Sequence, residues 1–304
     1  MSASVIAIVG PTATGKSDLA LDLAEHLGAE IVNADAMQFY RGMDIGTAKV
    51  PVAERRGIPH HQLDVLEVHQ EASVAAYQKY GRADLAAIAA RGRRAVVVGG
   101  SGLYVRALLD EMSFPGTDPR VRAELEARAE AEGPGVLHAE LGRVDPVAAE
   151  RIDSRNARRI VRALEVIRLT GKPFSANLPE HRYAIPAVQI GLEMPAARLD
   201  QRIDARAVSM FEAGLIEETR ALVANGLERG RTANRAVGYA QALAVLRGEC
   251  DVAQAVADTG LATRQLARRQ IKWFRRDPRV HWLRAGAGVL HRALGHLETR
   301  SDAQ

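Results

Sequence analysis

The stretch VIAIVGPTATGKS, residues 5–17, decides the fold of this chain. Residues 5–9 form a short apolar run that predicts a buried strand, and residues 10–17 match the pattern G-x-x-x-x-G-K-[ST]. In a phosphate-binding loop of this pattern, glycines let backbone N–H groups face phosphate oxygens, and the next helix adds the positive end of its dipole. The amphipathic pattern of 17–27, which ends at Gly28, predicts that helix. A polyphosphate ligand is therefore the first expectation.

Two side chains of this loop add to the expected site. Lys16 would supply a mobile positive charge, and the Ser17 hydroxyl could hold Mg²⁺, the expected cofactor. The candidate phosphate-binding residues are Gly10, Pro11, Thr12, Ala13, Thr14, Gly15, Lys16 and Ser17. An ordinary glycine turn is the alternative, but the strand before the loop and the helix after it favour phosphate binding.

Further apolar runs at 30–33, 94–98 and 187–192 alternate with helical patterns. This alternation predicts an α/β fold with a parallel sheet flanked by helices, and with the loop it is P-loop NTPase-like. Ligands of such sheets bind beyond the carboxyl ends of the strands. The phosphate-binding loop would lie at that edge.

A change of character after residue 115 predicts a second domain. Charged helical patterns without strand signals cover 116–185, including one predicted helix at 145–169. This segment is read as a helical insertion between two parts of the catalytic core, residues 1–115 and 186–298. Residues 299–304 are expected to form a loose tail.

The composition excludes several classes of protein. The single cysteine, Cys250, allows neither an intrachain disulfide nor a multi-cysteine metal site. Because no apolar run is long enough to span a bilayer and no signal-peptide pattern is seen, we expect a cytoplasmic protein without a membrane partner. We also expect a monomer. The net charge of +4 leaves room for a polyanionic partner without establishing nucleic-acid binding.

Several polar residues are expected near the phosphate-binding loop. Asp35 follows the second predicted strand and is a candidate general base or metal ligand, with a helix cap as the alternative. The turn-rich segment 40–49 and the glycine-rich segment 99–104 are interpreted as binding loops. His60 and His61 are not expected to bind a metal, because no third ligand accompanies them and adjacent histidines on a turn cannot both face one core.

Arginines are the second theme of the sequence. Five recur at spacings of three and four within one predicted helix: Arg151, Arg155, Arg158, Arg159 and Arg162. Such a face suits a phosphate backbone, but the interspersed acidic residues allow a solvated, salt-bridged face equally well. Arg202 and Arg206 could approach a pyrophosphate opposite Lys16, or form surface ion pairs with nearby carboxylates.

Eight motifs occur in order along the chain. They are GPTATGKS at 10–17, DAMQ at 35–38, RGMDIGTAK at 41–49, HHQLD at 60–64, GGSGLY at 99–104, RRIVRALE at 158–165, RAVGY at 235–239 and TRQLARRQ at 263–270. Together they strongly resemble the bacterial tRNA dimethylallyltransferase family, also called tRNA isopentenyltransferases or the IPP transferase family. The ordered set is far more specific than the phosphate-binding loop alone.

This resemblance implies a reaction and the residues that carry it. A dimethylallyl group would pass from dimethylallyl diphosphate to N6 of the adenine 3′ of the anticodon, in tRNAs that read UNN codons. Asp35 matches the family's base, Lys16 and Ser17 match residues that hold the diphosphate, and Arg206 matches an arginine that assists there. The helical insertion would grip the anticodon stem-loop.

The resemblance also implies contacts with tRNA. The matching positions are Asp35, Ala36, Met37, Gln38, Ser101, Arg158, Arg159, Ile160, Val161, Arg162, Arg235, Ala236, Val237, Gly238, Tyr239 and Ala240. Three of them depart from the family pattern. Gln38 stands where leucine is common, Ser101 where threonine is common, and Ala240 where a longer polar or basic residue often sits.

Three rival activities fit parts of the same pattern. A small-molecule kinase would use the loop and sheet for ATP-dependent phosphoryl transfer. An adenylate prenyltransferase would use free AMP, ADP or ATP as acceptor, although the basic insertion favours tRNA. A non-catalytic RNA-binding module would explain the arginines but leave Asp35 and the loop without a role.

Overall fold

The structure, a computed structural model, describes residues 5–177 and 181–301. Its chain forms two compact units. The larger consists of Met1–Leu109 and Tyr183–Gln304, and the smaller of Asp110–Arg182.

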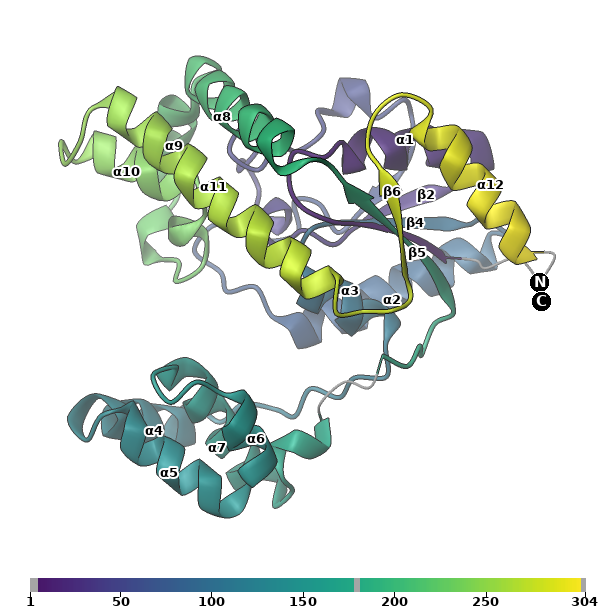
Figure 1. The fold of residues 1–304 in the computed structure, drawn as a ribbon. Helices are drawn as coiled ribbons and strands as arrows, with labels where there is room; N and C mark the ends of the chain where they lie inside the picture. The colour runs from purple at the N-terminus through teal and green to yellow at the C-terminus, as the bar shows by residue number, and fades with distance from the viewer. Residues whose placement is uncertain (1–4, 178–180, 302–304) are drawn as a thin grey trace. The chain divides into compact units, whose positions relative to one another are not determined.

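The larger unit is built on a parallel sheet in the order β3-β2-β4-β1-β5-β6 (Figure 1). The strands are β1 (Val5–Val9), β2 (Glu30–Asn33), β3 (His60–His61), β4 (Ala95–Val98), β5 (Ala187–Glu193) and β6 (Val280–Arg284). Val5 of β1 pairs with Ala95 of β4 and with Ala187 of β5. The phosphate-binding loop therefore follows a central strand.

Both faces of this sheet are covered, which explains why its central strands are continuous apolar runs. On one face Ile6 and Ile8 pack in a core cluster with residues of α1 and α12. On the other face Ala7 and Val9 pack with residues of α2 and α3 (Figure 1). The helices of this unit are α1 (Lys16–Leu27), α2 (Val74–Ala90), α3 (Gly102–Leu109), α8 (Ala196–Glu212), α9 (Leu215–Ala224), α10 (Tyr239–Leu246), α11 (Val252–Phe274) and α12 (Val289–Ser301).

The smaller unit is helical and has a core of its own. It contains α4 (Pro119–Ala131), α5 (Pro134–Val144), α6 (Pro146–Arg151) and α7 (Ala157–Thr170), which bury a cluster that includes Leu137 and Leu164. Aspartates and prolines set the starts of these helices. Asp118 and Asp145 cap α4 and α6, each with proline in the first turn.

The single helix predicted at 145–169 is wrong. The chain leaves the helix after Arg151 and starts a new one at Ala157, where Asn156 Oδ1 accepts a hydrogen bond from Arg159 N. Short polar side chains between the two helices, such as Asp153, compete for backbone hydrogen bonds and favour turns and caps. The five arginines therefore do not share one helical face.

The sequence patterns also missed edge elements. Neither β3, which has two histidines, nor β6, which includes the exposed polar residues His281 and Arg284, forms an apolar run. The expected loose tail begins within α12, which continues to Ser301 because its helical pattern has no breaker there; 302–304 lie outside the described residues. Across 5–177 and 181–301, every helix is too short or too polar to cross a membrane.

Candidate active site at the carboxyl edge of the sheet

The phosphate-binding loop is held in shape by its own side chains. Gly10 has φ +126°, and a Cβ there would lie 2.7 Å from the Leu192 carbonyl oxygen of β5, so glycine is required. The Thr14 hydroxyl and the Lys16 ammonium both donate to the Pro11 carbonyl, at 2.9 and 2.7 Å. The loop is thus preformed before the first turn of α1.

A glutamine from the C-terminal half of α11 fastens this loop to the next one. The Thr12 N–H donates to Gln270 Oε1 at 2.8 Å, and Gln270 Nε2 donates to the Gly100 carbonyl at 3.1 Å. Sequence reasoning did not single out Gln270. The available signal was a polar residue on the buried stripe that Ala267 and Phe274 mark on α11.

A cavity of about 500 Å³ in the larger unit lies against the phosphate-binding loop. It is lined by Thr12, Ala13, Gly15, Lys16, Ser17, Asp18, Asn33, Asp35, Gln38, Thr47, Ala48, Lys49, Val50, Pro51, Glu54, Val98, Gly99, Arg202, Ala205 and Arg206. Lys16 and Arg206, matched to the diphosphate site, and Asp35, matched to the base, therefore border one space although they are far apart in the sequence.

Two cations of this cavity, Lys16 and Arg206, lie near Asp35. Burial lowers the pKa of Lys16 to about 8, although nearby Asp35 opposes the shift and Arg206 adds to it. Burial also lowers the pKa of Arg206, again opposed by Asp35. Two crowded cations beside one carboxylate favour an anionic ligand.

Asp35 is both a cap and a residue of the cavity wall. Its carboxylate lines the cavity, and its Oδ1 accepts a hydrogen bond from Met37 N at 3.0 Å at the start of a short 3₁₀ turn, Ala36–Phe39. In the next residue, Ala36 N donates to Ser101 Oγ at 3.2 Å. The cap therefore holds Asp35 at the cavity wall and is compatible with the base role expected for it.

Segment 40–49 is anchored on both sides. Lys49 is buried, and its ammonium donates to Tyr40 O, to Asp44 Oδ1 and to Asp64 Oδ1, the last two at 2.6 Å. From α9, the Glu218 carboxylate accepts hydrogen bonds from the backbone of Asp44 and the next residue. The segment forms a rigid wall of the cavity.

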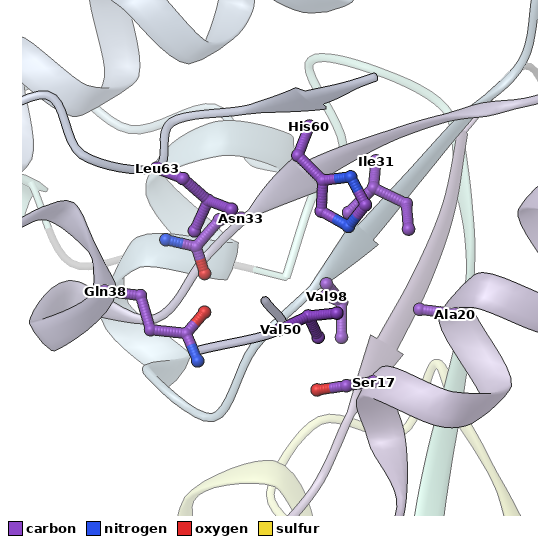
Figure 2. Close-up of a pocket in the computed structure, with 9 residues that line it drawn as sticks. All are labelled: Ser17, Ala20, Ile31, Asn33, Gln38, Val50, His60, Leu63 and Val98. Carbon is purple, nitrogen blue, oxygen red and sulfur yellow. The ribbon is translucent and has the colours of Figure 1, made fainter. Parts of the chain in front are cut away.

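A smaller recess adjoins this cavity beside Ser17 (Figure 2). It is lined by Ser17, Ala20, Ile31, Asn33, Gln38, Val50, His60, Leu63 and Val98. The Ser17 side chain points into it, and so do the amide groups of Asn33 and Gln38. Its volume of about 20 Å³ suits one water molecule and not a substrate group.

The two histidines lie on edge strand β3 and not on a turn. His60 Nδ1 lies 2.8 Å from Ile58 O, and burial lowers the pKa of His60. His61 Nε2 lies 2.7 Å from Glu30 Oε2. Within the described parts of the chain, no group of three or more His, Cys, Asp or Glu side chains could hold a metal ion.

The arginines divide into free and committed groups. Arg158 and Arg159 are exposed on α7, but Arg162 donates to Pro115 O, to Gly116 O and to Glu165. Burial would raise the pKa of the fully buried Glu165 carboxyl, but hydrogen bonds from arginines, Arg162 among them, outweigh it and hold that pKa below its usual value. Arg162 thus ties its unit together.

Other expected tRNA contacts are also divided by burial. Ile160 and Val161 lie in the core of the smaller unit, and Ala236 and Tyr239 lie in a core cluster of the larger one. Arg235 is exposed. On α8, Arg202 and Arg206 line the cavity, while the carboxylates expected to pair with them, Asp200 and Asp204, contact Arg268 and Arg264 of α11.

Comparisons with known proteins point in one direction. Residues 38–277 match the family model described as IPP transferase. The tRNA dimethylallyltransferase of Streptomyces avermitilis is 58% identical over 94% of this chain and 92% of its own length. That of Thermobifida fusca is 60% identical over 98% of this chain and 96% of its own length.

Solved structures agree with these sequence matches. The tRNA isopentenylpyrophosphate transferase of Bacillus halodurans superimposes with a TM-score of 0.70 at 36% identity and covers 98% of both chains. A eukaryotic dimethylallyltransferase, described as acting on tRNA, gives a TM-score of 0.81 at 27% identity over 93% of this chain and 74% of its own.

Proposed function

This chain belongs to the IPP transferase family and is a tRNA prenyltransferase, and we propose that its 500 Å³ cavity is where the transfer takes place. A dimethylallyl group passes from dimethylallyl diphosphate to N6 of the adenine 3′ of the anticodon, in tRNAs reading UNN codons. The products are N6-isopentenyladenosine and diphosphate. One observation carries the proposal: the phosphate-binding loop, the cations Lys16 and Arg206 and the carboxylate Asp35 border the same space.

The donor half of the reaction is electrostatic. When the allylic C–O bond breaks, its electron pair leaves with the diphosphate and positive charge develops on the allyl carbon. Lys16, Arg206 and the loop N–H groups lie where they can stabilise the departing anion, which is the group whose charge grows in the transition state. The positive end of the α1 dipole adds to this effect.

The acceptor half requires a base. The exocyclic N6 is a weak nucleophile, because its lone pair is delocalised into the adenine ring. Asp35 accepts the N6 proton as the new C–N bond forms, so no full positive charge has to build on nitrogen. The adenine must leave its stack to reach the cavity, and its position in a loop lowers that cost.

The residues present fit Mg²⁺ bound mainly through the donor. Ser17 offers one hydroxyl at the cavity wall, and Mg²⁺ typically takes one or two protein ligands with phosphate oxygens and water completing its shell. When bound, the ion would neutralise part of the diphosphate charge. Ser17 is the residue that would hold it.

The helical insertion supplies the surface for tRNA in this proposal. Exposed Arg158 and Arg159 of α7 suit the phosphates of an anticodon stem-loop, and exposed Arg235 suits a contact from the larger unit. The proposal includes a monomer, and a cytoplasmic location because tRNA is found in the cytoplasm.

The testing experiment uses the purified chain with Mg²⁺, dimethylallyl diphosphate and unmodified tRNA that carries adenine 3′ of its anticodon. After digestion, mass spectrometry should find isopentenyladenosine in the tRNA. A parallel reaction with AMP should yield no product. Prenylated AMP with unmodified tRNA would instead identify an adenylate prenyltransferase, and phosphoryl transfer from ATP would identify a kinase.

A further inference from the structure

Asn33, the last residue of β2, has a side chain that none of the reaction steps above uses. It is 2% exposed, and its carboxamide holds the backbone of Asp35 on both sides. Oδ1 accepts from Asp35 N at 2.9 Å, and Nδ2 donates to Asp35 O at 3.0 Å and to Gln62 O at 2.9 Å. The Asn33 carbonyl is itself held by the Tyr77 hydroxyl, at 2.9 Å.

The orientation of this amide is set by its partners. Its oxygen faces an N–H group and its nitrogen faces two carbonyls, so a flipped amide would lose all three hydrogen bonds. One of the two carbonyls belongs to Gln62, which has φ +58° and donates through Nε2 to Asp84 Oδ2 at 2.6 Å. Buried networks whose members are all satisfied are rigid.

Backbone packing also confines the residues around Asp35. A Cβ at Gly99 would lie 2.3 Å from the Ala34 carbonyl group, so β4 and its turn press closely on the segment. Ala34 N donates to Val98 O at 2.8 Å. With the cap to Met37 N, the Asp35 backbone and one of its carboxylate oxygens are all held.

We infer that Asn33 is a positioning residue for the transfer: its carboxamide fixes the peptide groups of Asp35 and so the direction in which the base enters the cavity. The inference rests on the proposed role of Asp35. A base must lie within hydrogen-bond reach of the proton it accepts, and an error of about 1 Å can reduce a rate on the order of 100-fold. Asn33 lines the cavity edge but makes no step of its own.

Two substitutions separate positioning from simple structural support. Asn33→Leu keeps the approximate size and removes all three hydrogen bonds. We expect kcat to fall on the order of 10- to 100-fold, while KM for dimethylallyl diphosphate and Kd for tRNA change less than about threefold. In the described part of the chain, the hydrogen bonds of this amide go to Asp35 and Gln62 and not to the phosphate-binding loop or to Arg158 and Arg159.

Asn33→Asp adds a pH readout. When protonated, the introduced carboxyl group still accepts from Asp35 N and donates to one carbonyl. When ionised, it has no proton to donate, and its negative charge faces the carbonyl oxygens of Asp35 and Gln62. The ratio of the variant's kcat to that of the wild type should therefore fall about tenfold as pH rises through the pKa of the introduced carboxyl group. Asn225→Asp, an exposed Asn-to-Asp change after α9, should leave this ratio at one.

Asp35→Asn serves as the reference for both. If it is inactive while both Asn33 variants keep wild-type kcat and pH profile, the positioning inference is wrong and the base role stands. If Asp35→Asn turns over normally, the base role fails and the inference fails with it. Equal losses in kcat and in both substrate affinities, with a lower melting temperature, would reduce Asn33 to structural support.

Discussion

At the scale of single residues, the candidate site brings a buried lysine and a capped aspartate to one cavity. Burial of Lys16 favours its neutral form, and a bound diphosphate would instead favour its charged form. The hydrogen bond from Met37 N to Asp35 Oδ1 restricts the carboxylate, which would otherwise be mobile in a loop. Both effects can be measured one side chain at a time.

The pH dependence of donor binding should report Lys16. Its pKa of about 8 in the free protein means that affinity for dimethylallyl diphosphate weakens as pH rises above about 8, because the binding cation is lost. Calorimetric titration at pH 7 to 9.5 checks this, with Lys16→Met as the control that carries any titration of the ligand itself. The same pH slope in both proteins would contradict the assignment.

For folding the sign of the pH dependence is opposite. A lysine pKa that is lowered in the folded protein adds to the free energy of unfolding as pH rises from about 8 to 10.5.

Replacing the base should separate chemistry from binding. In Asp35→Asn the side-chain oxygen can still accept from Met37 N, so the local turn survives. We expect kcat to fall on the order of 100-fold or more, with tRNA affinity within about twofold. Single-turnover rates and filter binding check the two quantities, and near-normal turnover would exclude Asp35 as the base.

At the scale of elements, α11 connects loops that the chain keeps far apart. Gln270 on its buried side joins the phosphate-binding loop to the 99–104 turn. Segment 40–49 depends in the same way on α9 and α10: Glu218 accepts from its backbone, and a Cβ at Gly46 would overlap the Tyr239 ring. The walls of the cavity are therefore held by helices that lie between β5 and β6 in the chain, far from the loops that they contact.

Gln270→Met should loosen the phosphate-binding loop. It leaves Thr12 N and Gly100 O without their partner, and each unsatisfied buried group costs about 1–3 kcal/mol of unfolding free energy. We expect KM for dimethylallyl diphosphate to rise about tenfold, with lower stability to urea. Gln254→Met, an exposed change on the same helix, is the matched control. A stability loss with unchanged KM would limit Gln270 to structural support.

At the scale of the whole molecule, the cavity and the exposed arginines of α7 belong to different units of the chain. The cavity belongs entirely to the larger unit, and Arg158 and Arg159 belong to the smaller. Substitutions of these two arginines and of cavity residues can therefore test tRNA binding and chemistry separately.

Removing Arg158 and Arg159 together should weaken tRNA binding with little effect on chemistry. Each lost phosphate contact releases about one counterion fewer, so the slope of log K against log salt should flatten by about 1 to 2. Arg162 is left in place because it ties its own unit together. Lys79→Ala with Arg284→Ala removes two exposed charges from the larger unit as a control. An unchanged salt slope in the Arg158 and Arg159 variant would show that these two arginines form a solvated face.

The sequence by itself determined the central sheet, the phosphate-binding loop and the place of Asp35. Buried parallel strands are short continuous apolar runs, and the loop needs glycines at fixed spacing, so both leave signals within a few residues of each other. The edge strands β3 and β6 left none, since one face of each is partly exposed.

Two features depend on tertiary packing: which polar side chains hydrogen-bond the loops of the site, and which arginines are exposed and not hydrogen-bonded within their own unit. Gln270 accepts a hydrogen bond from Thr12, which is 258 residues away in the sequence. Arg162 forms its hydrogen bonds within its own unit. Tyr239 is buried, although its motif suggested a tRNA contact. Periodicity and motif spacing report on neighbours along the chain. Hydrogen bonds between distant segments, and the burial that makes them matter, exist only once the elements have packed together.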